Sequence, residues 1–158
     1  MKNIRLVLVL LFLGLNAYSQ DRGKKENLFE MQKVKVIIDI DKNVFTNVYA
    51  NMYVSKKPNA LVVALFLPIS YNQQKLKLDA LFVSKKMKIK GEKMIRGKKV
   101  LFMKGTINKE GIDFIKEVYY LKYNKKTSIE LTIMLDINAD AKYKKMINEI
   151  VYSVIEKN

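Results

Sequence analysis

The strongest constraint on the fold lies near the C-terminus, where apolar residues recur every three or four positions between Asp136 and Ile155. The apolar positions are Tyr143, Met146, Ile147, Ile150, Val151, Val154 and Ile155. This spacing places them on one stripe of an α-helix, and Asn138 or Asp140 can cap its first turn. Burying each such side chain is worth about 1.5–3 kcal/mol before entropy is subtracted. The helix must therefore lie on a large apolar surface, which we expect the preceding strands to supply.

The N-terminal residues predict an export signal. Lys2 and Arg5 precede an apolar run over residues 6–15, and the small residues near position 19 suit cleavage before Gln20. This run is about half of the roughly twenty residues that span a bilayer. We therefore expect residues 1–19 to be a cleaved signal peptide, with no membrane span in the remaining chain and a periplasmic or secreted location.

The remaining length is enough for one domain with a real core. We expect residues 20–32 to be a lead-in and residues 33–158 to form a single α+β domain. The chain has no cysteine, so its stability must come from packing rather than from disulfides.

Alternating and continuous apolar runs predict a β-sheet. We expect strands over residues 33–41, 60–67, 86–90, 100–107, 114–123 and 129–135, a glycine-bounded connection over 91–97 and a hairpin turn over 108–111. Residues 44–55 fit either a helix or a strand, and their β-branched and aromatic side chains favour a strand.

A second helix is predicted over residues 70–85, where Ser70 can cap the first turn. Its apolar residues are Leu76, Leu78, Leu81, Phe82 and Val83. The fold class is therefore α+β: an antiparallel sheet meander with the C-terminal helix on one face and the second helix on the other.

The order of these elements resembles a known group of proteins. A strand and a helix are followed by strands through an Ile95–Val100 step, a hairpin at Gly111, a last strand and a terminal helix that ends with Ile150–Ile155. Over residues 60–155 this order resembles the Mog1/PsbP-like superfamily. The resemblance implies a non-enzymatic accessory protein that binds another protein, and it implies no shared catalytic residue.

The residue types present exclude most catalytic chemistry. The chain has neither His nor Cys, which removes the commonest general base, the usual zinc ligands and every thiol nucleophile. Glu117 and Glu130 would form a glycosidase-type carboxylate pair if they met on adjacent strands, but surface carboxylates on a wet sheet face are the default explanation. We expect no enzyme activity and no cofactor.

Two aspartate clusters place oxygen ligands at alternate positions, at 39–43 and at 136–140. A calcium-binding EF-hand loop also needs Gly at its sixth position and Glu at its twelfth. The first cluster has Val44 and Ala50 there, and the second has Ala141 and Ile147. We therefore expect a β-turn and a helix cap, with no metal.

The chain is strongly basic, with a formal net charge of +15. Residues 75–109 hold twelve Lys or Arg against two acidic residues. The candidate binding residues in this stretch form what we call the lysine ridge, namely Lys86, Lys88, Lys90, Lys98, Lys99 and Lys104. Such a ridge can meet phosphates or acidic partners. The alternative is a solvated face, which the dominance of Lys over Arg favours.

Three functions fit these features. The first is an exported accessory protein that binds another envelope protein. The second is a binder of an anionic envelope component, lipopolysaccharide or an acidic glycan, through the lysine ridge. The third is an immunity-type inhibitor of a periplasmic toxin. Export leads us to expect no nucleic-acid partner.

Overall fold

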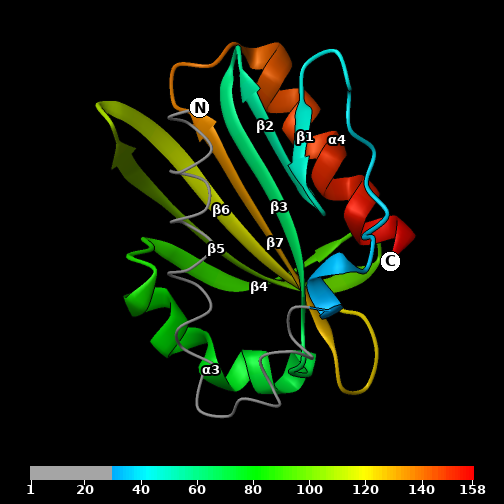
Figure 1. Ribbon diagram of the computed structural model, residues 1–158. Coiled ribbons are helices and arrows are strands. Elements are labelled where there is room, and N and C mark those ends of the chain that lie inside the picture. Colours follow the sequence, from blue (N-terminus) through cyan, green and yellow to red (C-terminus); the bar gives the residue numbers. More distant parts are fainter. Residues whose placement is uncertain (1–29) are drawn as a thin grey trace.

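The computed structural model describes residues 30–158 (Figure 1). The predicted signal peptide and most of the predicted lead-in lie outside these described residues. Residues 30–33 are helical. The elements that follow are β1 (Thr46–Tyr49), β2 (Met52–Lys56), β3 (Asn59–Leu67), α3 (Tyr71–Ser84), β4 (Ile89–Ile95), β5 (Lys98–Lys109), β6 (Ile112–Lys122), β7 (Ser128–Asp136) and α4 (Ala141–Lys157).

The strands form one seven-stranded antiparallel sheet with the order β1-β2-β3-β7-β6-β5-β4. Two meanders, β1 to β3 and β4 to β7, are joined where β3 pairs with β7. The chain passes between them through α3, which delivers β4 to the far edge (Figure 1). The predicted α+β class is confirmed, with one helix on each face of the sheet.

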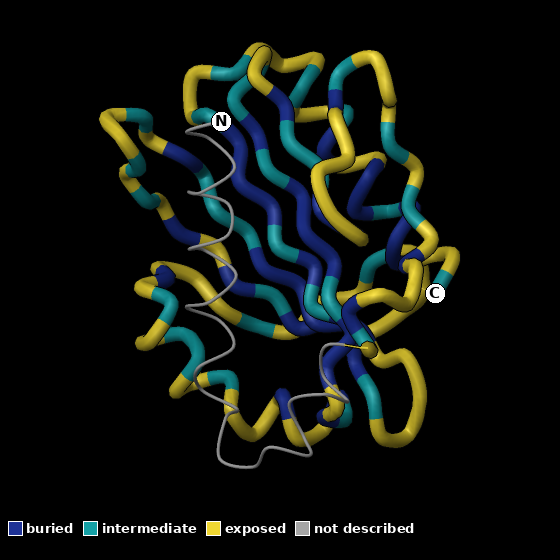
Figure 2. The backbone as a smooth tube through the Cα atoms, viewed as in Figure 1, coloured by how far each residue is buried: buried dark blue, intermediate teal, exposed yellow. Residues whose placement is uncertain are grey.

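The face under α4 holds the larger apolar core. The α4 side chains Ile147, Ile150 and Val154 pack there with alternate residues of the central strands, such as Leu131 and Ile133. Figure 2 shows this central part of the sheet as the most continuously buried. The predicted apolar stripe is confirmed. Asp140 stands at the N-cap, but its side chain makes no capping hydrogen bond.

The opposite face packs against α3. Ser70 and Gln73 form a capping box, which confirms the predicted helix start. The predicted apolar side of this helix is wrong in part, because Leu76 is 86% exposed and Val83 is 74% exposed. The buried residues of α3 are Tyr71 and the polar Gln74.

Residues 34–40 correct the prediction of a first strand. They form no strand, and Val34 is half-exposed while Val36 is fully buried, so the alternation does not mark one sheet face. The Asn51 side chain takes the place of a strand partner. Its Oδ1 accepts from the Val36 N–H at 2.9 Å, and its Nδ2 donates to the Val34 carbonyl at 2.8 Å.

Two side chains at the end of α4 bind the same segment. Ser153 Oγ accepts from the Asp39 N–H at 3.0 Å. Asn158 accepts from the Ile37 N–H at 3.1 Å and donates to the Ile37 carbonyl at 2.8 Å. Side chains therefore satisfy backbone groups that a neighbouring strand would otherwise have bound.

The structure also tests the predictions for residues 44–55, for the connection over 91–97 and for the hairpin at Gly111. Most of residues 44–55 form strands rather than a helix, since β1 and β2 pair as a hairpin around Ala50, whose φ is 41°. The predicted connection over 91–97 is wrong for most of its length, because β4 continues through Gly91 to Ile95. Only Arg96 and Gly97 form the turn, with φ of 49° and 75°. The predicted hairpin at Gly111 is confirmed.

Candidate functional site

A hollow of about 470 Å³ lies between β4 and α4. We call it the β4–α4 groove, and its lining includes Lys93, Met94, Arg96, Tyr119, Asn148 and Tyr152. The first three come from the edge strand and its turn, Tyr119 from β6, and the last two from the outer side of α4. Lys93 lies on the α4 face of the sheet, because it pairs with Val100, which belongs to the core under α4. Tyr119 belongs to the same core and therefore lies on the same face.

Both cations of the groove lie over aromatic rings. The Lys93 ammonium is 4.6 Å from the centre of the Phe102 ring and 5.2 Å from that of Tyr119. The Arg96 guanidinium carbon is 4.7 Å from the centre of the Tyr152 ring. Ring contacts of this kind attract cations electrostatically and fix their position. The groove thus presents two oriented positive charges beside apolar surface.

Tyr119 joins the groove to a charged pair on β5 and β6. Its hydroxyl donates to Glu117 Oε2 at 2.8 Å, and Glu117 Oε1 lies 2.8 Å from the Lys104 ammonium. Burial raises the pKa of the Tyr119 hydroxyl well above its ordinary range, and the negative charge of Glu117 raises it further. The phenol is therefore a fixed hydrogen-bond donor at physiological pH.

Alkaline titration should reveal this donor. The folded-state pKa of Tyr119 is raised above an unfolded value of about 10, so its contribution to stability is complete below pH 10 and is lost as pH rises further. Phenolate absorbance of the folded protein should show late ionisation of Tyr119 and of Tyr71, whose pKa is also raised by burial, and Tyr119→Phe should remove the Tyr119 part of it. Glu117→Gln, which removes the anion and keeps the burial, should move that ionisation part of the way back. If Tyr119→Phe instead removed a tyrosine that ionises near the ordinary pKa of about 10, the assignment would be contradicted.

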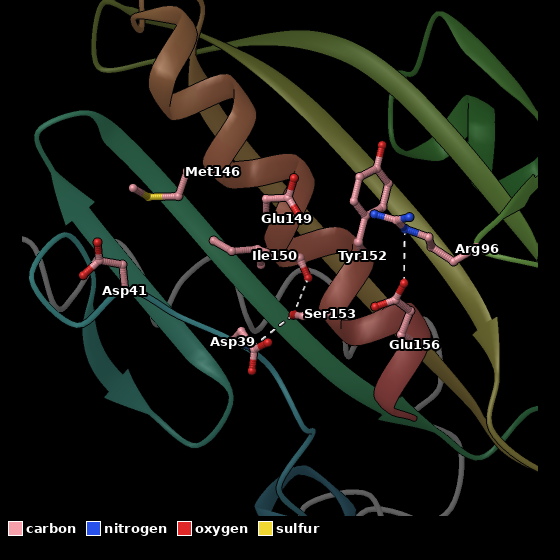
Figure 3. Close-up of a pocket in the computed structure, with 9 residues that line it drawn as sticks. All are labelled: Asp39, Asp41, Arg96, Met146, Glu149, Ile150, Tyr152, Ser153 and Glu156. Carbon is pink, nitrogen blue, oxygen red and sulfur yellow. Dashed lines mark hydrogen bonds and ion pairs between the residues drawn. The ribbon is translucent and has the colours of Figure 1, made fainter.

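A smaller hollow of about 190 Å³ lies on the other side of the Arg96–Tyr152 contact (Figure 3). Three of its four carboxylates, those of Asp39, Asp41 and Glu156, already have cationic or backbone partners. Arg96 Nε lies 3.1 Å from Glu156 Oε1, and Lys157 Nζ lies 2.6 Å from the Asp39 carboxylate. Among residues 30–158 no group of His, Cys, Asp or Glu side chains is arranged to hold a metal ion.

The first aspartate cluster forms the predicted turn, whereas the second lies just before α4 without the predicted side-chain cap. Asp41 Oδ1 accepts from the Asn43 N–H at 2.9 Å, within a turn. Asp136 Oδ1 accepts from the Asn138 N–H at 3.0 Å, just before α4. Neither arrangement resembles a calcium loop.

The residues of the lysine ridge do not share one surface. Lys98 and Lys104 lie on the α4 face, as partners of Ile95 and Ile89, whereas Lys90 and Lys99 lie on the α3 face. Lys86 and Lys88 precede β4 and are exposed.

Three lysines of the ridge also have partners within the protein. Lys90 pairs with Asp79, Lys104 with Glu117, and Lys98 donates to the backbone carbonyls of Glu156 and Asn158. Their positive charge is therefore partly neutralised before any ligand arrives.

The carboxylate pair considered from the sequence does not form. Glu117 lies on the α4 face beside Lys104, and Glu130 lies on the α3 face, 2.7 Å from the Lys85 ammonium. The two carboxylates stay apart because Glu117 pairs with Ile133 and Glu130 pairs with Tyr120, and these two pairs lie on opposite faces of the sheet.

Sequence reasoning missed the groove residues Lys93, Arg96, Tyr119 and Tyr152. Gly91 and Gly97 favoured a loop between them, which removed Lys93 and Arg96 from the sheet. A strand that continues through Gly91 would have put Lys93 in register with Val100. The contact of Arg96 with α4 has no signal in the sequence, since it joins residues far apart in the chain.

No helix within the described part of the chain is long and apolar enough to cross a membrane. No protein-family model and no curated protein matches this chain. A crystal structure from Bacteroides thetaiotaomicron VPI-5482 is similar over 69% of this chain and only 40% of its own, at 10% identity and a TM-score of 0.45. LpqN, involved in cell envelope biogenesis of Mycobacterium tuberculosis, is similar over 75% of this chain and 79% of its own, at 11% identity and a TM-score of 0.46. Neither similarity assigns a family, and the resemblance to the Mog1/PsbP-like superfamily stays a prediction.

Proposed function

We propose that this protein is an exported, non-enzymatic accessory protein that binds another protein of the cell envelope through the β4–α4 groove. The supporting observation is the pair of ring-held cations, Lys93 and Arg96, beside Tyr119 and Tyr152. Protein interfaces are enriched in Arg and Tyr, and a few such residues carry most of the binding free energy. Export is supported by the predicted signal peptide.

The charges of the groove favour a partner with carboxylates. Lys93 and Arg96 both border the hollow, and Arg96 has one carboxylate partner, Glu156. A carboxylate that enters beside Lys93 would leave water and contact a cation that is surrounded by aromatic rings. Charge-assisted hydrogen bonds are stronger in such a partly dehydrated site. Asn148 adds an amide that can donate to the same group.

A pull-down from envelope extract tests the proposal with three forms of the tagged protein. The groove variant carries Lys93→Gln and Arg96→Asn, where asparagine tolerates the left-handed backbone at position 96. The control carries Lys125→Gln and Lys126→Gln in the exposed β6–β7 turn and loses the same charge. Loss of one interface anchor costs about 2 kcal/mol, and the groove variant removes two, so affinity should fall by at least about thirtyfold in this variant only.

Other outcomes separate the remaining functions. A protein retained equally by all three forms would contradict the groove as the site. Phosphate-rich lipid or acidic glycan that is captured instead, and released as salt rises, would favour the lysine ridge. A toxin as the captured protein would specify the immunity-type function. Turnover of an envelope substrate by the pure protein would contradict a non-enzymatic role.

A further inference from the structure

The strand β4 ends the sheet on the side opposite β1. Its residues 89–95 pair along their whole length with β5, and within the described residues no strand lies on their other side. Five of its seven residues are exposed (Figure 2). An edge strand of this kind presents a row of unpaired backbone N–H and C=O groups to any extended chain that approaches.

The two edges of the sheet differ in how they resist such pairing. The strand β1 has four residues and an irregular register between Asn47 and Tyr49. Short length and irregularity are common protections against edge pairing. The strand β4 has seven residues and an unbroken register with β5. It has the length of an ordinary strand and lacks both protections.

Lysine side chains on an edge strand usually prevent another chain from pairing with it. The lysines of β4 instead make contacts on the two faces of the sheet. The Lys90 ammonium pairs with Asp79 and lies 4.8 Å from the centre of the Phe82 ring, both in α3. Lys93 lies over Phe102 and Tyr119 on the opposite face. The backbone between them is left beside the exposed apolar side chains of Ile89 and Met94, which are 54% and 60% exposed.

The helix α3 holds this edge in position. Glu92 of β4 accepts from the Tyr71 hydroxyl at 2.7 Å and lies 2.8 Å from the Lys75 ammonium. The hydrogen bonds from Lys75 and Tyr71 lower the pKa of Glu92, so it stays ionised and bound. A fixed edge loses little conformational entropy when another strand pairs with it.

The charge around β4 indicates which kind of strand can pair with it. Residues 86–99 contain seven basic residues and one acidic residue. A second copy of this edge would bring two such basic stretches together, and like charges across an interface oppose association. An acidic chain meets complementary charge instead. From the edge and its charge we infer that an extended acidic segment of a partner protein pairs with β4 as an eighth strand.

This inference rests on the proposed function and specifies how the partner binds. On the α4 face β4 presents Ile89, Gly91, Lys93 and Ile95. Gly91 leaves room for the Phe102 ring, since an added Cβ would lie 3.1 Å from that ring. An apolar side chain beside Phe102 and an acidic one beside Lys93, two positions apart on the added strand, fit this face. The acidic side chain then enters the β4–α4 groove.

The test uses a capped peptide, TVTETVTET, whose valine and glutamate side chains share one face when it is extended. Its matched control, TVTKTVTKT, replaces glutamate with lysine. We expect the acidic peptide to bind and to slow amide hydrogen exchange at alternate residues of 89–95, with β1 unchanged. The lysine peptide should bind at least about tenfold more weakly.

Two proline variants test the backbone contact itself. Neighbouring N–H groups in a strand point to opposite edges, so one of Met94→Pro and Ile95→Pro removes an outward donor and the other a donor to β5, and neither removes the Lys93 charge. The variant that keeps the wild-type melting temperature should lose at least about tenfold in peptide affinity. If the folded variant binds normally, or if protection appears outside β4, the inference is wrong.

The remaining outcomes distinguish this inference from the proposed function. No peptide binding below about 1 mM overturns edge pairing, as does capture of phosphatidylglycerol vesicles with β4 amides unprotected. A partner from the extract that is lost by the groove variant and kept by the proline variant supports the groove without edge pairing. A partner lost by the proline variant and kept by the groove variant supports edge pairing and contradicts the groove.

Discussion

Replacement of Leu131 by alanine should lower the free energy of unfolding by about 2–5 kcal/mol. Leu131 is fully buried at the centre of β7, the middle strand of the sheet. Its neighbours in register, Ala64 on β3 and Tyr119 on β6, face the same core beneath α4. The substitution removes three carbon atoms and leaves a cavity that neither the paired strands nor the helix can close without losing their own contacts.

The chain contains a matched control for this change. Leu76 of α3 is 86% exposed, so Leu76→Ala removes the same atoms from a site that already lies in water. Its effect should stay within about 0.5 kcal/mol. Urea unfolding of the two variants and the wild-type protein measures both values. Equal effects of the two substitutions would contradict the placement of β7 in the core.

Replacement of Asn51 by alanine should loosen the start of the segment 34–40, around Val36, while Ser153 and Asn158 still bind its later residues. The Asn51 side chain is buried and binds the N–H of Val36 and the carbonyl of Val34. Without it the buried Val36 N–H loses its partner, at a cost of about 1–3 kcal/mol for that one group. The segment has no strand ladder to replace the lost bonds.

Amide hydrogen exchange at Val36 is the direct measurement, with protease cleavage within residues 34–41 as a second. Both should rise in Asn51→Ala. Asn138→Ala removes the same group from an exposed position before α4 and should change neither. Val36 exchange that remains as slow as in the wild-type protein would show that the Asn51 side chain does not hold the segment.

The sequence predicts those elements whose pattern is set by burial on a regular surface. The stripe of α4 and the alternation in β7 follow directly from the periods of a helix and a strand, and both are confirmed. The pairing of β3 with β7 is not visible from local patterns, because it depends on where α3 carries the chain.

The errors have identifiable physical causes. Residues 34–40 carry a strand-like pattern, but the side chains of Asn51, Ser153 and Asn158 satisfy their backbone groups. Leu76 and Val83 suggested an apolar helix face, yet they point to solvent. Gly91 suggested a loop, yet its missing side chain makes room for Phe102 within the sheet.

The candidate site was predictable only as a basic region. Composition locates the excess of lysine, but the face on which each lysine lies depends on the register of β4 with β5. The ring contacts of Lys93 and Arg96 depend on tertiary neighbours from β6 and α4. The lysines that lie close together in the sequence are therefore divided between the α4 face and the α3 face of the sheet.

The side-chain bonds of residues 34–40 have an evolutionary consequence. Every residue except proline supplies the backbone groups of a strand ladder, so β3 to β7 keep their hydrogen bonds through most substitutions. The segment instead depends on the identity of three distant residues, Asn51, Ser153 and Asn158. In related sequences we therefore expect Asn51, Ser153 and Asn158 to be retained together, while apolar residues of the strands are replaced by other apolar residues.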